Sequence, residues 1–416
     1  MHARSWLSSL ETIGIKLGLS QITRLLDELD HPERAYRSVT VAGTNGKGSV
    51  TAMIERGLRA AGQRTGRYTS PHLVGIEERI VIDGVPIAAG TFDALAARVQ
   101  DAAAALDAPP SFFEATTALA LLAFCDAGVT IAVLEVGLGG RLDATNVVDS
   151  SVVAITSIAL DHQEYLGDTL VKIAREKAGI IKPGATVIVG TNPPEVLEVI
   201  GEVAAQMEAM VIHALVGVRV NASASAQDTT LQVTTARAEY GECTLRLPGR
   251  HQVVNAMIAV RVLESLPDVP PEAIRTALSD VEWPARLEWL TWNGHDILLD
   301  GAHNPAGAQA LASFLEEMVP QPVPIVIGVM RDKAAQDIVR ALAPRASLFV
   351  ATAAPSPRAM APAQLGALCR ATGVTTVEVD DPGEGVAMAA RHGTPVVVAG
   401  SLYLAGHVRS ALLTGA

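Results

Sequence analysis

A loop with the composition of a phosphate-binding site lies early in the chain, at Gly43-Thr-Asn-Gly-Lys-Gly-Ser49. Its glycines let backbone N–H groups approach an anion, Lys47 supplies a positive charge for phosphate oxygens, and Ser49 supplies a hydroxyl that can bind a metal ion. Gly48 separates Lys47 from Ser49, whereas the usual P-loop has lysine followed at once by serine or threonine. The loop therefore predicts a variant polyphosphate site, and a plain structural turn is the alternative.

Three polar side chains follow short apolar runs, where strands are expected to end. Glu135 lies at the end of the run Ile131–Val136, and His162 and Ser70 stand just beyond other such runs. Sheets of alternating strands and helices place ligand sites at the carboxyl ends of their strands, and a carboxylate there suits Mg²⁺. We expect Glu135 to bind a metal ion, with Ser70 and His162 able to complete the site. A structural role is the alternative for His162.

Two further segments have compositions of interest. The run Gly139–Thr145 is too rich in glycine for the interior of a helix or strand, and it carries Arg141 beside Asp143, which suits a substrate-binding loop. Lys177 lies on a predicted helix whose apolar stripe includes Ile173 and Ala178. Taken alone, Lys177 is typical of a solvated helix lysine.

The elements that must position these residues follow an alternating pattern. Ser38–Ala42 is a β-branched run that predicts a strand, the glycine-rich loop follows it, and a helix is expected from about Ser49 to Ala61. Later strands and helices alternate in the same way, which predicts a doubly wound α/β domain with a parallel sheet. The expected strands are Ile131–Val136, Val152–Ile158 and Thr186–Val189, and the expected helices include the alanine-rich stretch near 94–108, Glu114–Cys125 and Val171–Gly179.

The pattern changes in the second half of the chain. From Val211 to Leu247 short alternating pieces predict a β-rich insertion, and a helix is expected at about Gln252–Leu266. After a connector at Trp283–Arg286, strands and helices alternate again, which predicts a smaller α/β domain. We expect the domains to span residues 1–287 and 288–416. The expected elements of the second are Ile297–Leu299, a helix from Ala306, Ile325–Ile327, Leu348–Ala351, Thr375–Val379 and Val396–Ala399.

Composition limits the class of protein. The chain has 416 residues, 49% hydrophobic and 18% charged, which favours a folded protein of two domains over a disordered or fibrous one. Its formal net charge of −12 opposes general attraction to nucleic acid or anionic membranes. The 3 cysteines lack metal-type spacing and are expected to be reduced. No apolar run reaches the roughly 20 residues of a membrane span, so we expect a cytoplasmic protein. We also expect it to be a monomer.

Seven motifs in order resemble those of one family. They resemble the folylpolyglutamate synthase and dihydrofolate synthase branch of the Mur ligase superfamily, and the extra glycine in the phosphate loop resembles that branch in particular. They cover most of residues 5–305: Gly43–Ser49, Tyr68–Leu73, Phe113-Glu114, Leu134–Asn146, Thr156–His162, Arg175–Ile180 and Leu299–Pro305.

The resemblance implies a P-loop-containing ATPase domain followed by a Rossmann-like domain, and it implies roles for individual residues. The magnesium ligands would be Ser70, Glu135 and His162, with Glu135 shared between two ions, and Lys177 would be carbamylated. Lys47 and His303 would take part in catalysis, with capping of the following helix as the alternative for His303. The nucleotide contacts would be Gly43, Thr44, Asn45, Gly46, Lys47, Gly48, Ser49, Asn255, Arg286 and Asp300. The substrate contacts would be Ser111, Leu142, Asp143 and Ala144, with a further contribution from Gly14–Leu17.

The implied reaction is an ATP-dependent ligation. The cofactors would be ATP and one or two Mg²⁺ ions, with room for a monovalent cation, and the substrates would be L-glutamate and a folate or dihydropteroate. Three other functions remain open from the sequence: a Mur ligase acting on a peptidoglycan precursor, a P-loop NTPase or kinase, and a non-catalytic ATP-binding regulator. A regulator would not turn over ATP, and the ATP turnover of an NTPase or kinase would not need an amine acceptor. A panel of substrates would separate a Mur ligase from a folate ligase.

Overall fold

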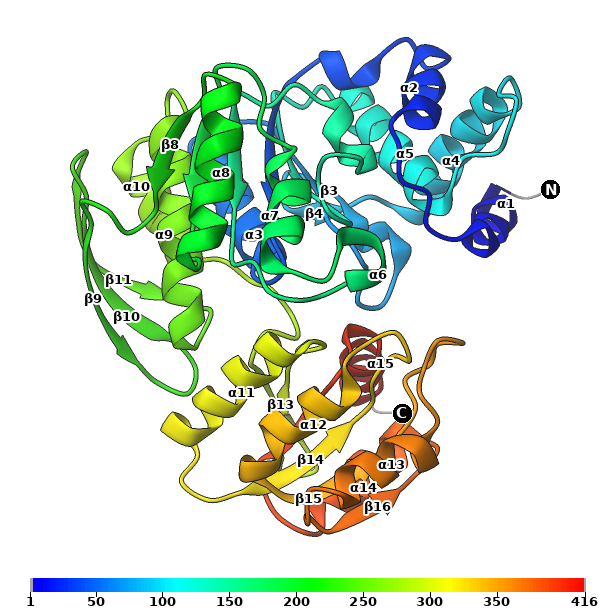
Figure 1. Cartoon of the computed structure of the whole chain (residues 1–416), viewed down its shortest axis with the longest axis vertical. Coiled ribbons are helices and arrows are strands. Elements are labelled where there is room, and N and C mark those ends of the chain that lie inside the picture. Colours follow the sequence, from blue (N-terminus) through cyan, green and yellow to red (C-terminus); the bar gives the residue numbers. More distant parts are fainter. Residues whose placement is uncertain (1–2, 415–416) are drawn as a thin grey trace. The chain divides into compact units, whose positions relative to one another are not determined.

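The structure is a computed structural model, and it describes residues 3–414. The chain folds into two compact units (Figure 1). The first contains the residues up to Asn221 together with Leu231–Thr244 and Val254–Val281. The second contains Ala222–Thr230, Leu245–Val253 and the residues from Glu282 onward. The connector therefore belongs to the second unit, and the domain limits expected from the sequence stay a proposal.

The first unit is built on an eight-stranded sheet with the order β4-β3-β2-β5-β1-β6-β7-β8. The strands from β2 to β8 in this order pair in parallel, and β3 and β4 form an antiparallel edge. The bounds are β1 (Arg37–Ala42), β2 (Thr65–Tyr68), β3 (Ile80–Ile82), β4 (Val85–Pro86), β5 (Ile131–Glu135), β6 (Val152–Ile155), β7 (Thr186–Val189) and β8 (Met210–His213).

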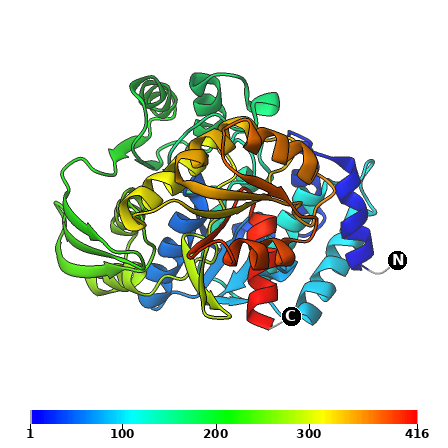
Figure 2. The ribbon, with the colours of Figure 1, turned by 90° about the horizontal axis from the view of Figure 1, so that it is seen from below.

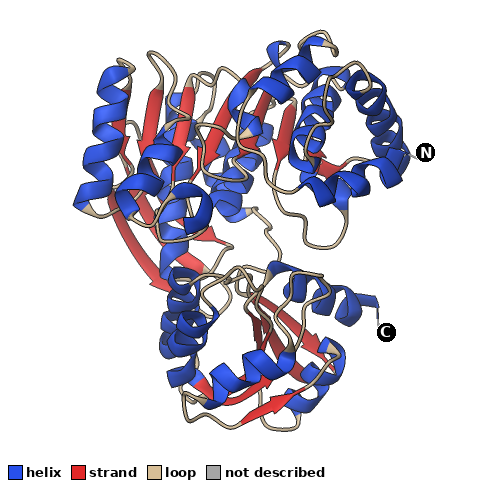
Figure 3. Cartoon of the chain, turned by 45° about the vertical axis from the view of Figure 1, so that its right-hand side comes forward, coloured by secondary structure: helices blue, strands red, loops and turns tan. Residues whose placement is uncertain are grey.

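Helices cover both faces of this sheet, as expected for a doubly wound fold (Figure 3). One face packs on α5, α7 and α8, because residues such as Leu134 and Ile155 belong to apolar clusters with those helices. The other face packs on α3, which in turn contacts α9 and α10. The helices of this unit are α1 (Ala3–Leu10), α2 (Ser20–Asp27), α3 (Lys47–Ala60), α4 (Ala89–Ala103), α5 (Phe112–Asp126), α6 (Gln163–Leu166), α7 (Leu170–Ala178), α8 (Pro194–Gln206), α9 (Arg250–Ser265) and α10 (Pro271–Ser279).

The β-rich segment differs from the expectation at its start. Met210–His213 pairs with β7 and forms an edge of the main sheet, so it continues the doubly wound pattern. A separate sheet follows, with the order β11-β10-β9, from β9 (Arg219–Ala224), β10 (Thr229–Thr234) and β11 (Glu239–Leu245). Tyr240 and Thr235 of this region both donate hydrogen bonds to the buried Glu264 of α9, which fixes the small sheet to that helix.

The second unit has a six-stranded sheet with the order β12-β13-β17-β14-β15-β16. Figure 2 shows the elements of this unit in yellow to red. All neighbours pair in parallel except β12, which pairs antiparallel with β13 at one edge. The strands are β12 (Glu288–Trp292), β13 (His295–Leu299), β14 (Val323–Ile327), β15 (Ala346–Ala351), β16 (Thr376–Glu378) and β17 (Val396–Ala399). The helices are α11 (Pro305–Met318), α12 (Ala335–Leu342), α13 (Pro362–Arg370), α14 (Pro382–Ala390) and α15 (Leu402–Thr414).

Two element limits near the phosphate loop differ from the predicted ones. Helix α3 begins at Lys47, two residues before the expected Ser49, because the loop turns directly into the helix. Strand β6 ends at Ile155, before the expected Ile158. The residues after Ile155 leave the sheet because Thr156 and Ser157 bond instead to the phosphate loop.

Candidate active site

The phosphate loop joins β1 to α3 at the carboxyl edge of the first sheet, and the segment after β6 holds it. A Cβ added at Gly43, whose φ is 147°, would lie 1.8 Å from Thr156 Oγ1, so this position needs glycine. Thr156 Oγ1 donates a hydrogen bond of 2.6 Å to the carbonyl of Asn45. Thr44 Oγ1 both donates to and accepts from the backbone of Ala159, at 3.1 Å each. These bonds fix the loop without using the side chain of Lys47.

Lys47 and Asn255 lie at the same loop. Lys47 is the first residue of α3, and its Nζ donates to the carbonyl of Thr44 at 3.2 Å. A Cβ on Gly46 would lie 2.4 Å from Asn255 Oδ1, so α9 brings Asn255 directly against the loop. Ser49, in the first turn of α3, is buried. The structure thus gathers the predicted nucleotide contacts of the first unit in one place.

Glu135 and Ser70 meet at the carboxyl ends of neighbouring strands. Strands β2 and β5 pair in parallel, and the backbone N–H of Ser70 donates to Glu135 Oε2 at 3.3 Å. Glu135 is 6% exposed. Carboxylate and hydroxyl oxygens, which Glu135 and Ser70 supply, are hard donors of the kind that Mg²⁺ prefers. These two residues therefore fit a magnesium site.

His162 lies on the loop between β6 and α6. Its backbone is left-handed, with φ at 50°, and its N–H donates to Asp161 Oδ1 at 2.9 Å. Its ring lies 4.0 Å from the same carboxylate, and the side chain is 32% exposed. Within residues 3–414 no group of three or more His, Cys, Asp or Glu side chains is arranged as a metal site. The predicted set includes only two such residues, and its assembly around Glu135 stays a prediction.

Lys177 is not a solvated helix lysine, so that alternative is wrong. The residue is 5% exposed, and its Nζ donates a 2.7 Å hydrogen bond to the carbonyl of Gly43. Helix α7 therefore directs this amine into the phosphate loop. The stripe of Ile173, Ala174 and Ala178 is buried as expected, and it fixes the helix against the sheet.

The predicted substrate loop is fixed by a buried carboxylate. Asp143 accepts hydrogen bonds from the N–H groups of Leu138 at 2.8 Å and Thr145 at 3.0 Å, and from the Thr145 hydroxyl at 2.5 Å. Burial raises the pKa of Asp143, and those three bonds partly oppose the rise. The carbonyl of Leu142 accepts a hydrogen bond from Gly18, so the N-terminal segment reaches this loop, and Ala144 is buried beside it.

Ser111 caps helix α5. Its Oγ accepts from the N–H of Glu114 at 3.2 Å, and the Glu114 carboxylate accepts from the Ser111 N–H and hydroxyl at 2.7 Å each. This reciprocal arrangement is a capping box, and both residues are buried. The geometry gives Ser111 a structural role and leaves its substrate contact a prediction.

Three predicted site residues lie in the second unit. Asp300 follows directly after β13 and accepts from the N–H groups of Leu287 at 3.0 Å and Ala302 at 2.8 Å. Burial raises its pKa, and the charge of Arg286 opposes that rise. His303 Nδ1 lies 2.8 Å from the carbonyl of Gly301. Because a carbonyl only accepts, Nδ1 carries the hydrogen and Nε2 is the basic nitrogen of the ring.

The alternative role of His303 as a helix cap is wrong. Asn304 is the residue that caps α11, since its side chain accepts from the N–H of Gly307 at 2.8 Å. The cap is thus one residue after His303. Asparagine is a common capping residue because its short side chain reaches the first free N–H groups of a helix, and histidine is not.

Sequence reasoning missed two groups near the site. His72 Nδ1 accepts a 3.0 Å bond from Arg79, and burial together with that arginine lowers the pKa of His72 to about 4. The sequence does point to His72, because this histidine lies in the same Tyr68–Leu73 motif as the proposed metal ligand Ser70. The second group is a set of ion pairs around Glu55 and Arg67. Nothing in the sequence predicts these pairs, because a glutamate on a helix is common.

Two family models match the chain. Residues 41–263 match the Mur ligase middle domain, and residues 285–402 match the Mur ligase, glutamate ligase domain. The two matches together span the phosphate loop, Glu135, Lys177, Arg286 and Asp300.

Named proteins of several organisms are similar over most of their length. A dihydrofolate synthase/folylpolyglutamate synthase of Bacillus subtilis is 36% identical over 353 residues, covering 82% of this chain and 82% of that protein. One of Escherichia coli is 36% identical, covering 79% of this chain and 76% of the other. Among solved structures, a Mycobacterium tuberculosis folylpolyglutamate synthase complexed with ADP has a TM-score of 0.93 at 33% identity, with 99% of each chain covered.

Proposed function

The chain belongs to the folylpolyglutamate synthase and dihydrofolate synthase family of the Mur ligases, and on that premise we propose that it accepts both reduced folates and 7,8-dihydropteroate. It is an ATP-dependent ligase that joins L-glutamate to a folate-type carboxylate through an amide bond. Relatives from Bacillus subtilis and Escherichia coli are named dihydrofolate synthase/folylpolyglutamate synthase, which supports activity on both kinds of substrate. Activity on peptidoglycan precursors has no such support.

The observation that carries this function is the convergence on the phosphate loop. The hydrogen bond from Lys177 to the Gly43 carbonyl places a buried amine at the same loop as Lys47, and Glu135 ends the strand next to β1. A polyphosphate, a hard cation and a reacting carboxylate can all be held by such an edge. A plain structural turn would not need a lysine on each side.

The reaction is a two-step activation of the folate carboxylate. A carboxylate oxygen attacks the γ-phosphorus of ATP, the bond to the bridging oxygen breaks, and ADP leaves. Lys47 balances negative charge on the phosphates during this transfer. The neutral amine of glutamate then attacks the acyl phosphate carbon, phosphate leaves, and the amine loses a proton. His303 is the proposed group near this second step, where its basic Nε2 can take up a proton.

Magnesium is the cation that this donor set fits, and we propose Ser70, Glu135 and His162 as its ligands. When bound, it would neutralise phosphate charge and orient the polyphosphate. Lys177 would assist as a carbamate, because addition of CO₂ to its neutral amine, with loss of a proton, creates an anion beside the phosphate loop. Arg286, Asp300 and Asn255 are the proposed further nucleotide contacts, and Leu142, Asp143 and Ala144 the proposed substrate contacts.

Release of ADP in four parallel reactions tests the function. Dihydropteroate and tetrahydrofolate are each supplied with and without L-glutamate, and ADP is measured over time. Sustained release only in the presence of glutamate is the expected result for both substrates. Equal release without glutamate would indicate an NTPase or kinase, and no release in any reaction would indicate an ATP-binding regulator. Lys47→Ala is the matched control, since it keeps the loop backbone and removes its charge.

A further inference from the structure

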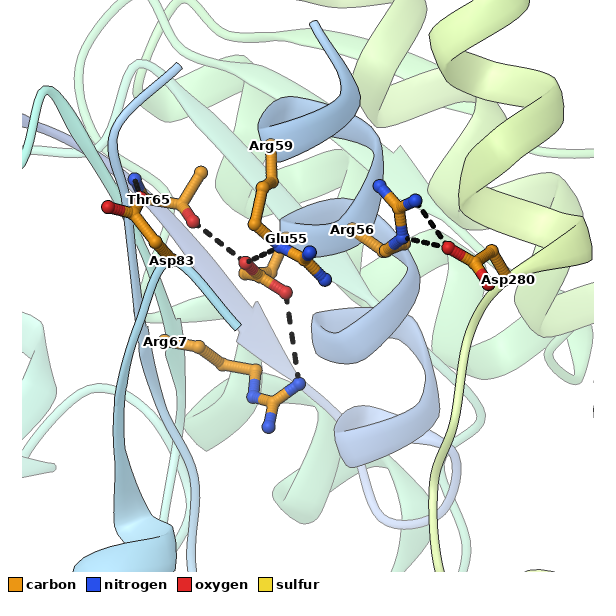
Figure 4. A network of polar contacts seen from close by, with 7 residues as sticks. All are labelled: Glu55, Arg56, Arg59, Thr65, Arg67, Asp83 and Asp280. Carbon is orange, nitrogen blue, oxygen red and sulfur yellow. Dashed lines mark hydrogen bonds and ion pairs between the residues drawn. The ribbon is translucent and has the colours of Figure 1, made fainter. Parts of the chain in front are cut away.

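A chain of ion pairs between α3 and β2 takes no part in the mechanism above (Figure 4). Its centre is Glu55, two turns along α3 from Lys47 and 1% exposed. Glu55 Oε1 accepts from Arg59 Nε at 3.0 Å and from the Thr65 hydroxyl at 2.7 Å. The other oxygen, Oε2, lies 3.9 Å from Arg67 Nη1. Glu55 thus joins the helix of the phosphate loop to strand β2.

The strand register aligns Arg67 with Glu135. Arg67 of β2 pairs with Val133 of β5, and residue 135 lies two positions further along that strand. Side chains two residues apart on one strand point to the same face of the sheet, so Arg67 and Glu135 share a face. The bond from Thr65 to Glu55 identifies that face as the one covered by α3. Arg67 therefore lies on the path from Glu55 to the carboxylate at the active site.

The charges of two carboxylates, Glu55 and Glu135, both act on the Arg67 guanidinium. Arg67 is 15% exposed, and burial lowers its pKa, while the negative charges of Glu55 and Glu135 oppose that lowering. Charges interact more strongly here than at the surface because the surrounding medium is less polarisable than water. A guanidinium that moved onto Glu135 would occupy the carboxylate oxygens that a cation needs.

We propose that Glu55 is a positioning residue: by holding the Arg67 guanidinium, it keeps Glu135 available to a divalent cation. This inference rests on the proposed function, in which Glu135 is a magnesium ligand. The proposal predicts the direction in which each variant changes cation binding. Loss of Glu55 releases Arg67 to compete with the cation, and loss of both residues removes the competitor.

Binding of Mn²⁺ with ADP tests the proposal without any turnover. Calorimetry measures ADP affinity in the absence of cation and across a Mn²⁺ titration, for the wild type, Glu55→Gln, Arg67→Met and the double variant. We expect Glu55→Gln to raise the half-saturating Mn²⁺ concentration roughly tenfold and to leave cation-free ADP affinity unchanged. Arg67→Met should not raise that concentration, and the double variant should return to within about twofold of the wild type.

Arg56→Met is the matched control. Arg56 is the next residue of the same helix, and its Nε donates to Asp280 at 2.8 Å, away from Glu55 (Figure 4). This variant should bind Mn²⁺ as the wild type does. Melting temperatures of all variants identify a purely structural effect, which would lower stability without changing the Mn²⁺ requirement.

Three results would overturn the proposal. The first is an unchanged Mn²⁺ requirement in folded Glu55→Gln, and the second is a double variant as impaired as Glu55→Gln. The third is a raised Mn²⁺ requirement in Arg67→Met. This third measurement still tests the proposal if Glu55→Gln does not fold. Failure of the proposed function would look different. The wild type would then bind Mn²⁺ with ADP as expected here, yet release no ADP in the glutamate-dependent reactions.

Discussion

In the proposed metal site, Glu135 would contribute charge and oxygen atoms more than packing. It ends β5, with its carboxylate directed to the Ser70 backbone. Replacement by glutamine keeps the size and one oxygen of the side chain. We therefore expect Glu135→Gln to lose at least about 100-fold in kcat/KM, in line with the loss of a key electrostatic group, while its melting temperature stays close to that of the wild type. Glutamate-dependent ADP release measures the first quantity. Near-wild-type turnover at ordinary Mg²⁺ would remove Glu135 from the metal site.

Lys177 offers a sharper test because its proposed role needs an anion. Its amine is buried and donates a hydrogen bond to the Gly43 carbonyl, whereas a carbamate at this position would supply negative charge. We expect Lys177→Ala to be nearly inactive and to be partly rescued by a small carboxylate such as acetate. Lys177→Arg should stay inactive, since a guanidinium cannot take up CO₂. Full activity of Lys177→Arg, or density for a bare amine in a substrate complex, would exclude the carbamate.

His251 should make the protein sensitive to acid. Burial, followed by the charge of Arg286, lowers the pKa of His251 to about 4, whereas an unfolded histidine titrates near 6.5. Between these values the unfolded chain binds a proton that the folded chain does not. The stability associated with neutral His251 is therefore fully present above about pH 6.5 and is lost as the pH falls towards about 4.

Urea unfolding at about pH 7 and about pH 5 measures this effect. The wild type should lose more stability between the two values than His251→Asn, which has no titrating ring. Asp300, whose pKa is raised, has an effect of opposite sign, but it is present in both proteins and cancels in the difference. Equal losses in the two proteins would contradict the shifted pKa.

The N-terminus of α5 holds a capping box and, in Ser111, a proposed substrate contact. Ser111 and Glu114 satisfy each other's backbone N–H groups in the capping box. We expect Ser111→Ala to lower the free energy of unfolding by about 1 kcal/mol, the usual effect of losing such a cap. Ser111→Thr keeps a capping hydroxyl and should restore the stability. Chemical denaturation of both variants measures this, and the KM for the folate substrate tests the proposed contact separately. A stable Ser111→Ala would contradict the capping role.

The regular elements were predictable because their apolar patterns are local. The run Thr186–Val189 gives β7, and Val396–Ala399 gives β17, as expected. The edge strand β4 (Val85–Pro86) was not predicted, because two residues are too few to show an apolar alternation and the strand is defined only by its pairing with β3. The ends of elements near the phosphate loop also depend on hydrogen bonds between distant residues. Strand β6, for example, ends early because Thr156 and Ser157 bond to that loop.

The site was predictable in its residue types and less so in its contacts. The phosphate loop and Glu135 follow from strand ends, which the sequence marks. The burial of Lys177 could not be foreseen, because the 2.7 Å bond to Gly43 joins residues 134 positions apart. The pairing of Arg67 with Glu55 similarly depends on strand register and on the packing of α3, neither of which a helix glutamate signals.

Each unit of the molecule contains some of the proposed site residues, next to its own mainly parallel sheet. The phosphate loop belongs to the first unit, and Arg286 and Asp300 belong to the second, where β13 ends. In the part of the chain that the structure describes, no helix is long and apolar enough to cross a membrane. The three cysteines, Cys125, Cys243 and Cys369, are free thiols, so the fold does not depend on disulfides. Packing and ligand binding must therefore supply the stability of both units.

If both units contact the nucleotide, one ligand should protect backbone amides in each of them. We expect ADP with Mg²⁺ to slow hydrogen exchange in two segments, the phosphate loop Gly43–Ser49 and the stretch Ala285–Ala302, because binding to the folded state suppresses local opening. Mass spectrometry of peptic fragments measures this. Asp300→Asn should weaken the protection of Ala285–Ala302 and leave most of that in the loop, while Lys47→Ala should weaken both. Protection confined to the loop in the wild type would remove Arg286 and Asp300 from the nucleotide site and restrict ATP binding to the first unit.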